Sequence, residues 1–277
     1  RVLLFLITLM VSVFGQKINQ GQFNSVSELS VAPITQSMKE MPVKMSQGDE
    51  ASLGRRVTAP AGEDVYHTLD VDGITRDYFV HLGSTDENRP LVISLHGLGQ
   101  SPEVHQGYTF MDPIADREGF IIAYPTANSE LFAYGELMPF AWMWDQDVPF
   151  LLDMIEDIQD AYQIDPSRIY VTGLSRGAMM AQYLANHHPE IISAFSSVAG
   201  YWKDYGSSFL PMSRGVAGLM IHNYYDQFTR WYYDYYDIRD LWAPENDTDP
   251  WVGVVFSEEP YVEYYNWANG RNGSDLS

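Results

Sequence analysis

The sequence predicts an α/β fold with a mostly parallel central sheet and helices on both faces. Residues 91–95 and 120–124 are apolar without polar alternation, which is typical of strands buried on both sides. Helical patterns separate such runs along the chain, and strands that alternate with helices indicate a parallel sheet. A strand, a sharp glycine-flanked turn and a helix around Ser175 complete the pattern.

The N-terminal segment does not fit this fold. Residues 2–15 form an uninterrupted apolar run after Arg1, too short to span a bilayer comfortably, and polar sequence follows. This predicts a signal peptide and hence a secreted (extracellular or periplasmic) protein; a buried N-terminal helix is the alternative. Because the chain starts with arginine and not methionine, we expect the signal peptide to be incomplete at its N-terminus.

Residues 16–62 are rich in Ser, Gln, Glu, Lys and Pro and show no sustained period. Such a composition predicts a disordered linker or pro-segment, although the sequence does not tell whether it is removed. We expect residues 63–277 to form one catalytic domain, because a chain of this length can bury a large core.

Local signals place the elements of this domain. Asp72-Gly73 between two alternating segments predicts a hairpin. A stripe of apolar residues marks the clearest helix, with Asp147 as its N-cap and Pro149 in its first turn. The expected elements are, in order, hairpin strands at 66–73 and 75–82, strands at 91–95 and 120–124 with a helix at 111–119 between them, a helix at 147–162, the strand before Ser175, and strands at 192–198 and 216–221.

The central motif is the G-x-S-x-G of residues 173–177. A β-branched run at residues 169–172 precedes it, and helix-compatible residues follow from Ala178. In this context the motif predicts a nucleophile elbow, in which Ser175 is held in a strained turn with its hydroxyl exposed. The flanking glycines let strand and helix approach, and the first amides of the helix face any negative charge at the serine.

A serine nucleophile needs an oxyanion site, an acid and a base. The glycine-rich loop 96–100 follows an early strand, so the backbone amides of Leu98 and Arg176 are the predicted oxyanion donors. His96 is expected to hold this loop in shape and not to act as the base. The acid is expected after a later strand, where Asp226 is the candidate among several acids in that stretch.

The sequence offers no convincing base. The expected order is serine, acid, histidine, yet no histidine follows His222. His187 and His188 fall about 18 Å from Ser175 along the following helix, where they suit the negative end of the helix dipole. His222 ends the strand that leads to Asp226 and would need an unusual geometry.

Composition excludes several other chemistries. The 37 acidic and 16 basic residues give a net charge of −21, which argues against nucleic acid or an anionic membrane as a partner. The absence of cysteine removes disulfides, thiol catalysis and cysteine-type zinc sites. We predict no metal, no membrane association after signal removal, and a monomer.

Several runs together resemble one known family. They are residues 72–81, 95–101, 115–125, 147–151, 164–175 and 221–226. From about Tyr66 to Gly270 the chain resembles the secreted feruloyl esterase and poly(3-hydroxybutyrate) depolymerase group of α/β-hydrolases, similar to carbohydrate esterase family one. The resemblance implies the α/β-hydrolase fold and a secreted serine ester hydrolase without a cofactor. Its substrates would be feruloyl-type or acetyl-type esters of plant or algal polysaccharide, or polyhydroxyalkanoate-type polyesters.

Carried over by position, the resemblance implies Ser175 as nucleophile, Asp226 as acid, and the amides of Leu98 and Arg176 as oxyanion hole. The family's base is a histidine in a Gly-His-x-Trp-Pro-like segment, which would lie beyond the last matched residues. The chain stops at Ser277 before such a segment. We therefore expect the domain to be truncated before its catalytic histidine, which would leave the fragment itself inactive.

Aromatic residues are the candidates for substrate binding. Trp142 and Trp144 precede the long helix, and Trp231 lies in a markedly aromatic segment after Asp226. Flat rings stack well on a phenolic acyl group or a sugar face; a packed core under a surface loop is the alternative. Two other functions stay open, namely a serine peptidase of the same fold and a catalytically inactive α/β-hydrolase that binds glycans.

Overall fold

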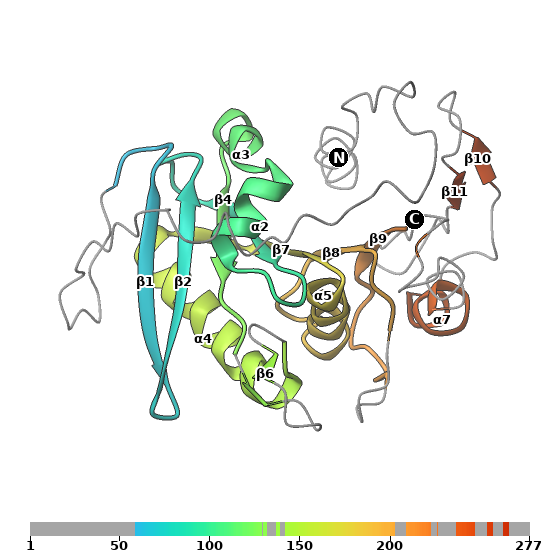
Figure 1. Cartoon of the computed structure of the whole chain (residues 1–277). Helices are drawn as coiled ribbons and strands as arrows, with labels where there is room; N and C mark the ends of the chain where they lie inside the picture. Colours follow the sequence, from blue (N-terminus) through green and yellow to red (C-terminus); the bar gives the residue numbers. More distant parts are fainter. Residues whose placement is uncertain are drawn as a thin grey trace, which may run out of the picture.

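The computed structural model describes residues 59–128, 130–131, 137–138, 142–202, 209–222, 226, 237–246, 254–256 and 263–265 (Figure 1). The predicted signal peptide, most of the predicted linker and Trp231 lie outside these residues, as does the side chain of Trp144. Among the helices that the structure describes, none is both long and apolar enough to cross a membrane.

A seven-stranded sheet forms the centre of the molecule, with strand order β1-β2-β4-β3-β7-β8-β9. Strand β2 runs antiparallel to β1 and β4, whereas neighbours from β4 through β3 and β7 to β9 run parallel. The prediction of a mostly parallel sheet is confirmed. The strands are β1 (Asp64–Val71), β2 (Ile74–Leu82), β3 (Arg89–Leu95), β4 (Ile121–Pro125), β7 (Ile164–Leu174), β8 (Ala194–Val198) and β9 (Ala217–Ile221).

The β1–β2 hairpin closes at the predicted turn. Asp72 and Gly73 both have positive φ, 53° and 80°, which a two-residue type I′ turn requires. The carboxylate of Asp70 accepts a hydrogen bond from Gly73 N at 2.9 Å. Turn chemistry and strand alternation therefore select the same local structure.

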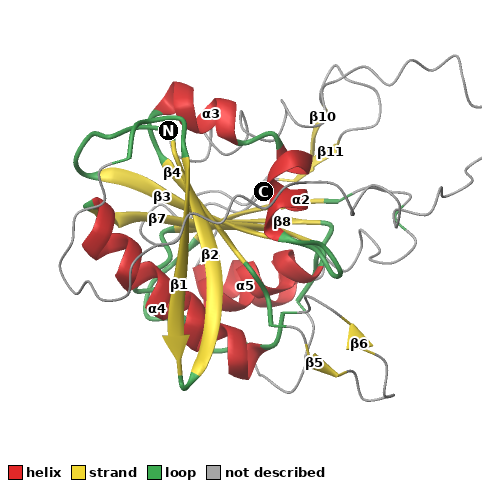
Figure 2. Cartoon of the chain, turned by 60° about the vertical axis from the view of Figure 1, so that its left-hand side comes forward, coloured by secondary structure: helices red, strands yellow, loops and turns green. Residues whose placement is uncertain are grey.

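Helices cover both faces of the sheet (Figure 2). Helices α2 (Pro102–Thr109) and α3 (Asp112–Glu118) lie on one face, and α4 (Trp144–Tyr162) and α5 (Arg176–His187) lie on the other. Side chains of β3 alternate between the two sides: Leu91 and Ile93 join the larger buried cluster, which includes α4 and α5 residues, and Val92 joins the smaller cluster with α3. Each central strand is thus buried on both faces.

Helix α2 is absent from the elements expected from the sequence, although the sequence carries a signal for it. Ser101 is its N-cap and accepts a hydrogen bond from Val104 N at 3.3 Å, and Pro102 occupies the first turn. The remaining short elements are β5 (Glu130–Leu131) paired with β6 (Leu137–Met138), β10 (Val254–Phe256) paired with β11 (Glu263–Tyr265), η3 (Ile238–Trp242) and α7 (Ala243–Asn246).

Helix α4 begins one turn earlier than the sequence predicts, so Asp147 is not its N-cap. Met143 takes that place. The buried Asp147 carboxylate accepts hydrogen bonds from Met143 N at 2.5 Å and Asn128 N at 3.0 Å, and it pairs with Arg76 of β2. Burial raises the pKa of Asp147, and the Met143 amide and the Arg76 charge oppose that rise. The carboxylate thus joins β2 and the chain after β4 to the start of α4.

The sheet order reverses between β3 and β7, because β4 follows β3 on one side and β8 and β9 follow β7 on the other. At such a point the carboxyl ends of the strands form a crevice where α/β sheets bind ligands. Helix α5 approaches β3 very closely here: a Cβ on Gly177 would lie 2.2 Å from Leu95 O and 2.6 Å from His96 O. A Cβ on Gly173 would lie 2.3 Å from the Gly177 backbone.

Gly177→Ala is expected to force α5 away from the end of β3, because real Cβ atoms do not approach backbone atoms within 3.0 Å. Overpacking of this kind costs about 1–3 kcal/mol, so the free energy of unfolding in urea should fall by at least that much. Gly107→Ala is the matched control, since a Cβ there meets nothing within 4 Å and helix α2 gains propensity. Equal stability of the two variants would contradict the close packing.

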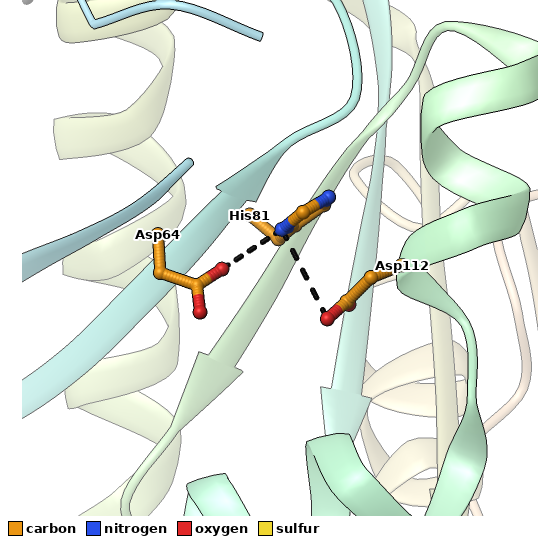
Figure 3. Close-up of side chains that lie close together, drawn as sticks. All are labelled: Asp64, His81 and Asp112. Atoms are coloured by element: carbon orange, nitrogen blue, oxygen red, sulfur yellow. Dashed lines mark hydrogen bonds and ion pairs between the residues drawn. The ribbon is translucent and has the colours of Figure 1, made fainter. Parts of the chain in front are cut away.

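At the amino end of β4, His81 lies between the carboxylates of Asp64 and Asp112 (Figure 3), and its other ring nitrogen faces Asp116. Its Nδ1 lies 2.8 Å from Asp64 and 3.9 Å from Asp112, and its Nε2 lies 3.0 Å from Asp116. Burial lowers the pKa of His81, but the hydrogen bonds to Asp64 and Asp116 and the charge of Asp112 outweigh this and raise it to about 9. The imidazolium therefore connects the edge strand β1 to β2 and α3.

His81→Gln should destabilise the protein in a pH-dependent way. The folded-state pKa of about 9 lies above the ordinary 6.5, so this stabilisation is full below pH 6.5 and is lost as pH rises through 9. We expect the substitution to lower the free energy of unfolding by roughly 1–3 kcal/mol near pH 6 and by much less near pH 10. Urea denaturation at the two pH values measures this, with His188→Gln, whose ring pairs with an exposed glutamate, as control. A loss that does not change with pH would contradict the assignment.

Candidate active site

Ser175 occupies the turn between β7 and α5. Its backbone φ of 54° and ψ of −110° lie outside the regions that residues with side chains favour. Ser175 N donates a hydrogen bond to Val198 O at 2.8 Å, and the residue is partly exposed. Strain of this kind costs on the order of 1–3 kcal/mol and persists only where the surrounding packing enforces it. Here the close contacts of Gly173 and Gly177 enforce it.

The two predicted oxyanion donors lie on elements that meet at this turn. Arg176 opens α5, whose first N–H groups have no acceptor within the helix and carry the positive end of its dipole. Leu98 lies in the loop after β3 and is 39% exposed. Within the described part of the chain, the N–H of Leu98 donates to no other residue. That amide is available to a ligand oxygen.

The loop after β3 is a tight turn. Gln100 N donates to Gly97 O at 3.2 Å, and Gly97 N donates to Gln100 Oε1 at 2.9 Å. Gly99 has φ of +75°, as the third position of a type II turn requires. Gln100 is a structural member of the site that the sequence reasoning missed, and the polar residue directly after the Gly-x-Gly run is the signal that could have indicated it.

His96 supports this loop, as predicted, and is not placed as a base. The ring is buried, and its Nε2 accepts a hydrogen bond from Ala127 N at 3.1 Å. Because Nε2 accepts, Nδ1 carries the proton and donates to Gly97 O at 2.8 Å. Burial lowers the pKa of His96 to about 4, although the Gly97 hydrogen bond acts in the other direction. The ring is therefore neutral at physiological pH.

Trp142 lies against the same loop and does not face solvent. It is 1% exposed, its ring centroid lies 4.9 Å from that of His96, and its Nε1 donates to His96 O at 2.8 Å. A stacking platform needs an exposed ring face. The expectation that Trp142 stacks on substrate is therefore corrected, because tertiary packing has buried the ring. Substrate-binding roles for Trp144 and Trp231 stay predictions.

Asp226 lies beyond the end of β9 and is partly exposed. Its Oδ2 lies 3.7 Å from Nε2 of His222, a distance for an ion pair but too long for a hydrogen bond. Strands β7, β8 and β9 are parallel neighbours, so they end at the same edge of the sheet. The predicted acid therefore follows a strand that ends on the same edge as Ser175.

The other histidines contact groups away from this edge or inside the fold. His105 is buried and hydrogen-bonded to Ser94 Oγ at 3.0 Å, and burial lowers its pKa to about 3. His187 stands at the end of α5, as predicted, with Nδ1 3.2 Å from Tyr183 O. His67 Nε2 lies 2.6 Å from Tyr162 OH, and His188 Nδ1 lies 3.4 Å from Glu190 Oε1. His81 lies among the carboxylates described above.

Among the described residues, one group has donor atoms spaced for a metal ion, namely Asp64, His81 and Asp112, whose atoms lie within 4.8 Å of one another. Both ring nitrogens of His81 face carboxylates, which is the arrangement of a charged imidazolium and leaves no nitrogen lone pair for a metal. The cluster lies at the amino end of β4, away from the carboxyl edge that carries Ser175.

Comparisons with known proteins give esterases and a depolymerase. Residues 75–210 match the family model described as Esterase PHB depolymerase, a range that contains Leu98, Ser175 and Arg176. The bifunctional acetylxylan esterase/xylanase XynS20E of Neocallimastix patriciarum is 30% identical over 133 residues, covering 46% of this chain and 18% of that protein. The putative esterase NocK of Nocardia uniformis subsp. tsuyamanensis is 33% identical, covering 47% and 39%.

A third relative, poly(3-hydroxyalkanoate) depolymerase C of Paucimonas lemoignei, is 29% identical over 47% of this chain and 33% of its own length. The chain thus matches well under half the length of these three relatives, between 18% and 39%.

Solved structures give the same fold. An acetyl xylan esterase from Aspergillus awamori superposes with a TM-score of 0.60 at 15% identity, over 76% of this chain and 91% of that one. A thermostable esterase gives a TM-score of 0.50 at 18% identity, over 64% and 51%. Residues 75–210 thus match the Esterase PHB depolymerase family model, and the chain shares the α/β-hydrolase fold of these solved esterases.

Proposed function

We propose that this chain is the catalytic part of a secreted serine hydrolase that cleaves carboxylic esters through an acyl-enzyme on Ser175. The observation that carries the proposal is the strained turn of Ser175, packed through Gly177 onto the loop that presents the Leu98 amide. The esterase domain supports ester cleavage, and the apolar segment 2–15 supports secretion.

In the proposed reaction, Ser175 Oγ attacks the ester carbonyl carbon while a histidine base takes the hydroxyl proton. The carbonyl oxygen becomes an oxyanion, and the amides of Leu98 and Arg176 stabilise it. As the carbonyl double bond re-forms, the ester C–O bond breaks and the base returns the proton to the leaving alcohol. Water then attacks the acyl group on Ser175 by the same steps and releases the acid.

Asp226 would orient the base and stabilise its charged form. His222 is one candidate base because it lies 3.7 Å from Asp226. The resemblance favours instead a histidine from a segment beyond the matched residues. The two assignments differ in one measurable respect, which is the effect of replacing His222.

For the substrate we propose feruloyl-type or acetyl-type esters of plant or algal polysaccharide, or polyhydroxyalkanoate-type polyesters. The names of the relatives, which include acetylxylan esterase, feruloyl esterase B and poly(3-hydroxyalkanoate) depolymerase C, support this range. The net charge of −21 would repel polyanionic substrates and nucleic acid. We propose that the protein acts as a monomer without a cofactor, with Trp144 and Trp231 as substrate contacts.

In a protein that includes the base histidine, Ser175→Ala should abolish hydrolysis of a soluble aryl acetate or methyl ferulate, lowering kcat by at least about 10⁴-fold, because the attacking oxygen is gone. Ser193→Ala is the control: its hydroxyl donates to Ser167 O at 2.7 Å, away from the carboxyl edge of the sheet, so activity should not change. Retained hydrolysis in Ser175→Ala would refute the proposed mechanism.

Asp226→Asn should lower kcat by about 10²- to 10⁴-fold, because an amide orients the base histidine in the wrong tautomer. Asp240→Asn, an exposed acid in η3, is the matched control and should stay within about twofold of wild type. Equal activity of the two variants would remove Asp226 from the triad. His222→Gln in the same assay decides the base: a loss as large as that of Ser175→Ala assigns it to His222.

A further inference from the structure

We propose that Trp142 is a positioning residue for the oxyanion hole and that it acts through the carbonyl group of His96. This inference rests on the proposed function, because it concerns how the Leu98 amide is aimed at the reacting oxygen. It replaces the stacking role that the sequence suggested for this tryptophan.

The peptide between His96 and Gly97 is held at both of its polar groups. A peptide unit is planar, so fixing its C=O and N–H fixes the whole plane. Trp142 Nε1 donates to His96 O at 2.8 Å, and Gly97 N donates to Gln100 Oε1 at 2.9 Å. Both ends of this peptide are therefore held, one by a buried indole and one by the side chain of the turn itself.

The next peptide, between Gly97 and Leu98, is held through its carbonyl oxygen. Its carbonyl oxygen accepts from His96 Nδ1 at 2.8 Å and from Gln100 N at 3.2 Å. In a trans peptide the N–H points away from the C=O. With Gly97 O held on the protein side by two donors, the Leu98 N–H is directed to the other side, and it donates to no residue in the described part of the chain.

The loop after β3 also packs against the turn that carries the nucleophile. His96 O lies 2.6 Å from the position that a Cβ on Gly177 would occupy, two residues after Ser175. The carbonyl group that accepts the hydrogen bond from Trp142 is therefore also a group against which Gly177 packs. A change in its orientation shifts the Leu98 amide relative to Ser175, and both must meet the same carbonyl group of the substrate.

Trp142 is suited to this task because it is itself immobilised. It is 1% exposed, and its ring lies 4.9 Å from the His96 ring at an interplanar angle of 39°. The indole N–H has a partner in His96 O, as buried donors require. Its ring also supports the His96 imidazole, so one side chain steadies both peptides of the loop.

The test is Trp142→Phe, which keeps a ring and removes the N–H. Loss of one oxyanion donor costs about 10²–10³ in kcat, and a misdirected donor should cost part of that, about 10-fold or more, with KM within about twofold. Trp242→Phe is the matched control. Trp242 is 0% exposed and its Nε1 donates to Gln182 Oε1 at 3.3 Å, so this variant also loses one buried indole hydrogen bond.

Kinetics with a soluble aryl ester and urea denaturation of both variants separate the possible results. The proposal predicts comparable losses of stability but a fall in kcat for Trp142→Phe alone. Similar kcat values in the two variants, or a raised KM with unchanged kcat in Trp142→Phe, would overturn it, since the first indicates a purely structural role and the second a substrate contact.

A second readout keeps the inference independent of turnover. If wild type that includes the base histidine shows no Ser175-dependent hydrolysis, the proposed function fails, and the positioning claim is then read from the ¹⁵N–¹H resonances of Gly97 and Leu98. These resonances should move in Trp142→Phe and not in Trp242→Phe. Unchanged resonances in Trp142→Phe would overturn the claim on their own.

Discussion

The geometry of the site depends on one contact between backbone atoms. Gly177 packs directly against the carbonyl oxygens of Leu95 and His96. Distances of 2.2 and 2.6 Å from a hypothetical Cβ show that no other residue fits without backbone movement. Because of this contact, α5 starts directly beside the end of β3. The strained turn of Ser175 and the loop that carries Leu98 are therefore built against each other, at the point where the strand order of the sheet reverses.

The hydrogen bonds of buried polar groups around this contact stabilise the loop after β3 and also fix the orientation of its peptide groups. His96 is neutral because burial lowers its pKa to about 4, so it can accept from Ala127 N and donate to Gly97 O at once. Protonation would turn Nε2 from an acceptor into a donor facing another N–H. A neutral histidine in a dry position is thus a better support for a loop than a charged one, whereas His81, surrounded by carboxylates, is held in the charged form.

The sequence predicts most of the fold because the signals involved are local. Period-two alternation around Asp72-Gly73 predicts the hairpin, and continuous apolar runs predict the buried parallel strands. The glycines of residues 173–177 predict the elbow, because a close contact between strand and helix leaves no room for side chains at these two positions. The chain segments that follow the strands then place Leu98, Ser175 and Asp226 after β3, β7 and β9.

The misses have long-range causes. Asp147 has the residue type of an N-cap, yet α4 starts at Trp144 because that carboxylate is engaged with Arg76 and Asn128, far away in sequence. A tryptophan such as Trp142 can stack on a sugar, but tertiary packing decides whether its indole ring lies on the surface or in the core. Neither the ion pair of Asp147 nor the burial of Trp142 produces a pattern in the residues next to them in the sequence.

The most direct test of the central claim is to trap the acyl-enzyme. The protein would be mixed with an aryl ester, quenched in acid during turnover, and digested for mass spectrometry. The account predicts one acyl group on the peptide that contains Ser175, and none after substitution of that serine. Hydrolysis of the ester with the acyl group on another residue, or with no covalent adduct at any time point, would contradict it.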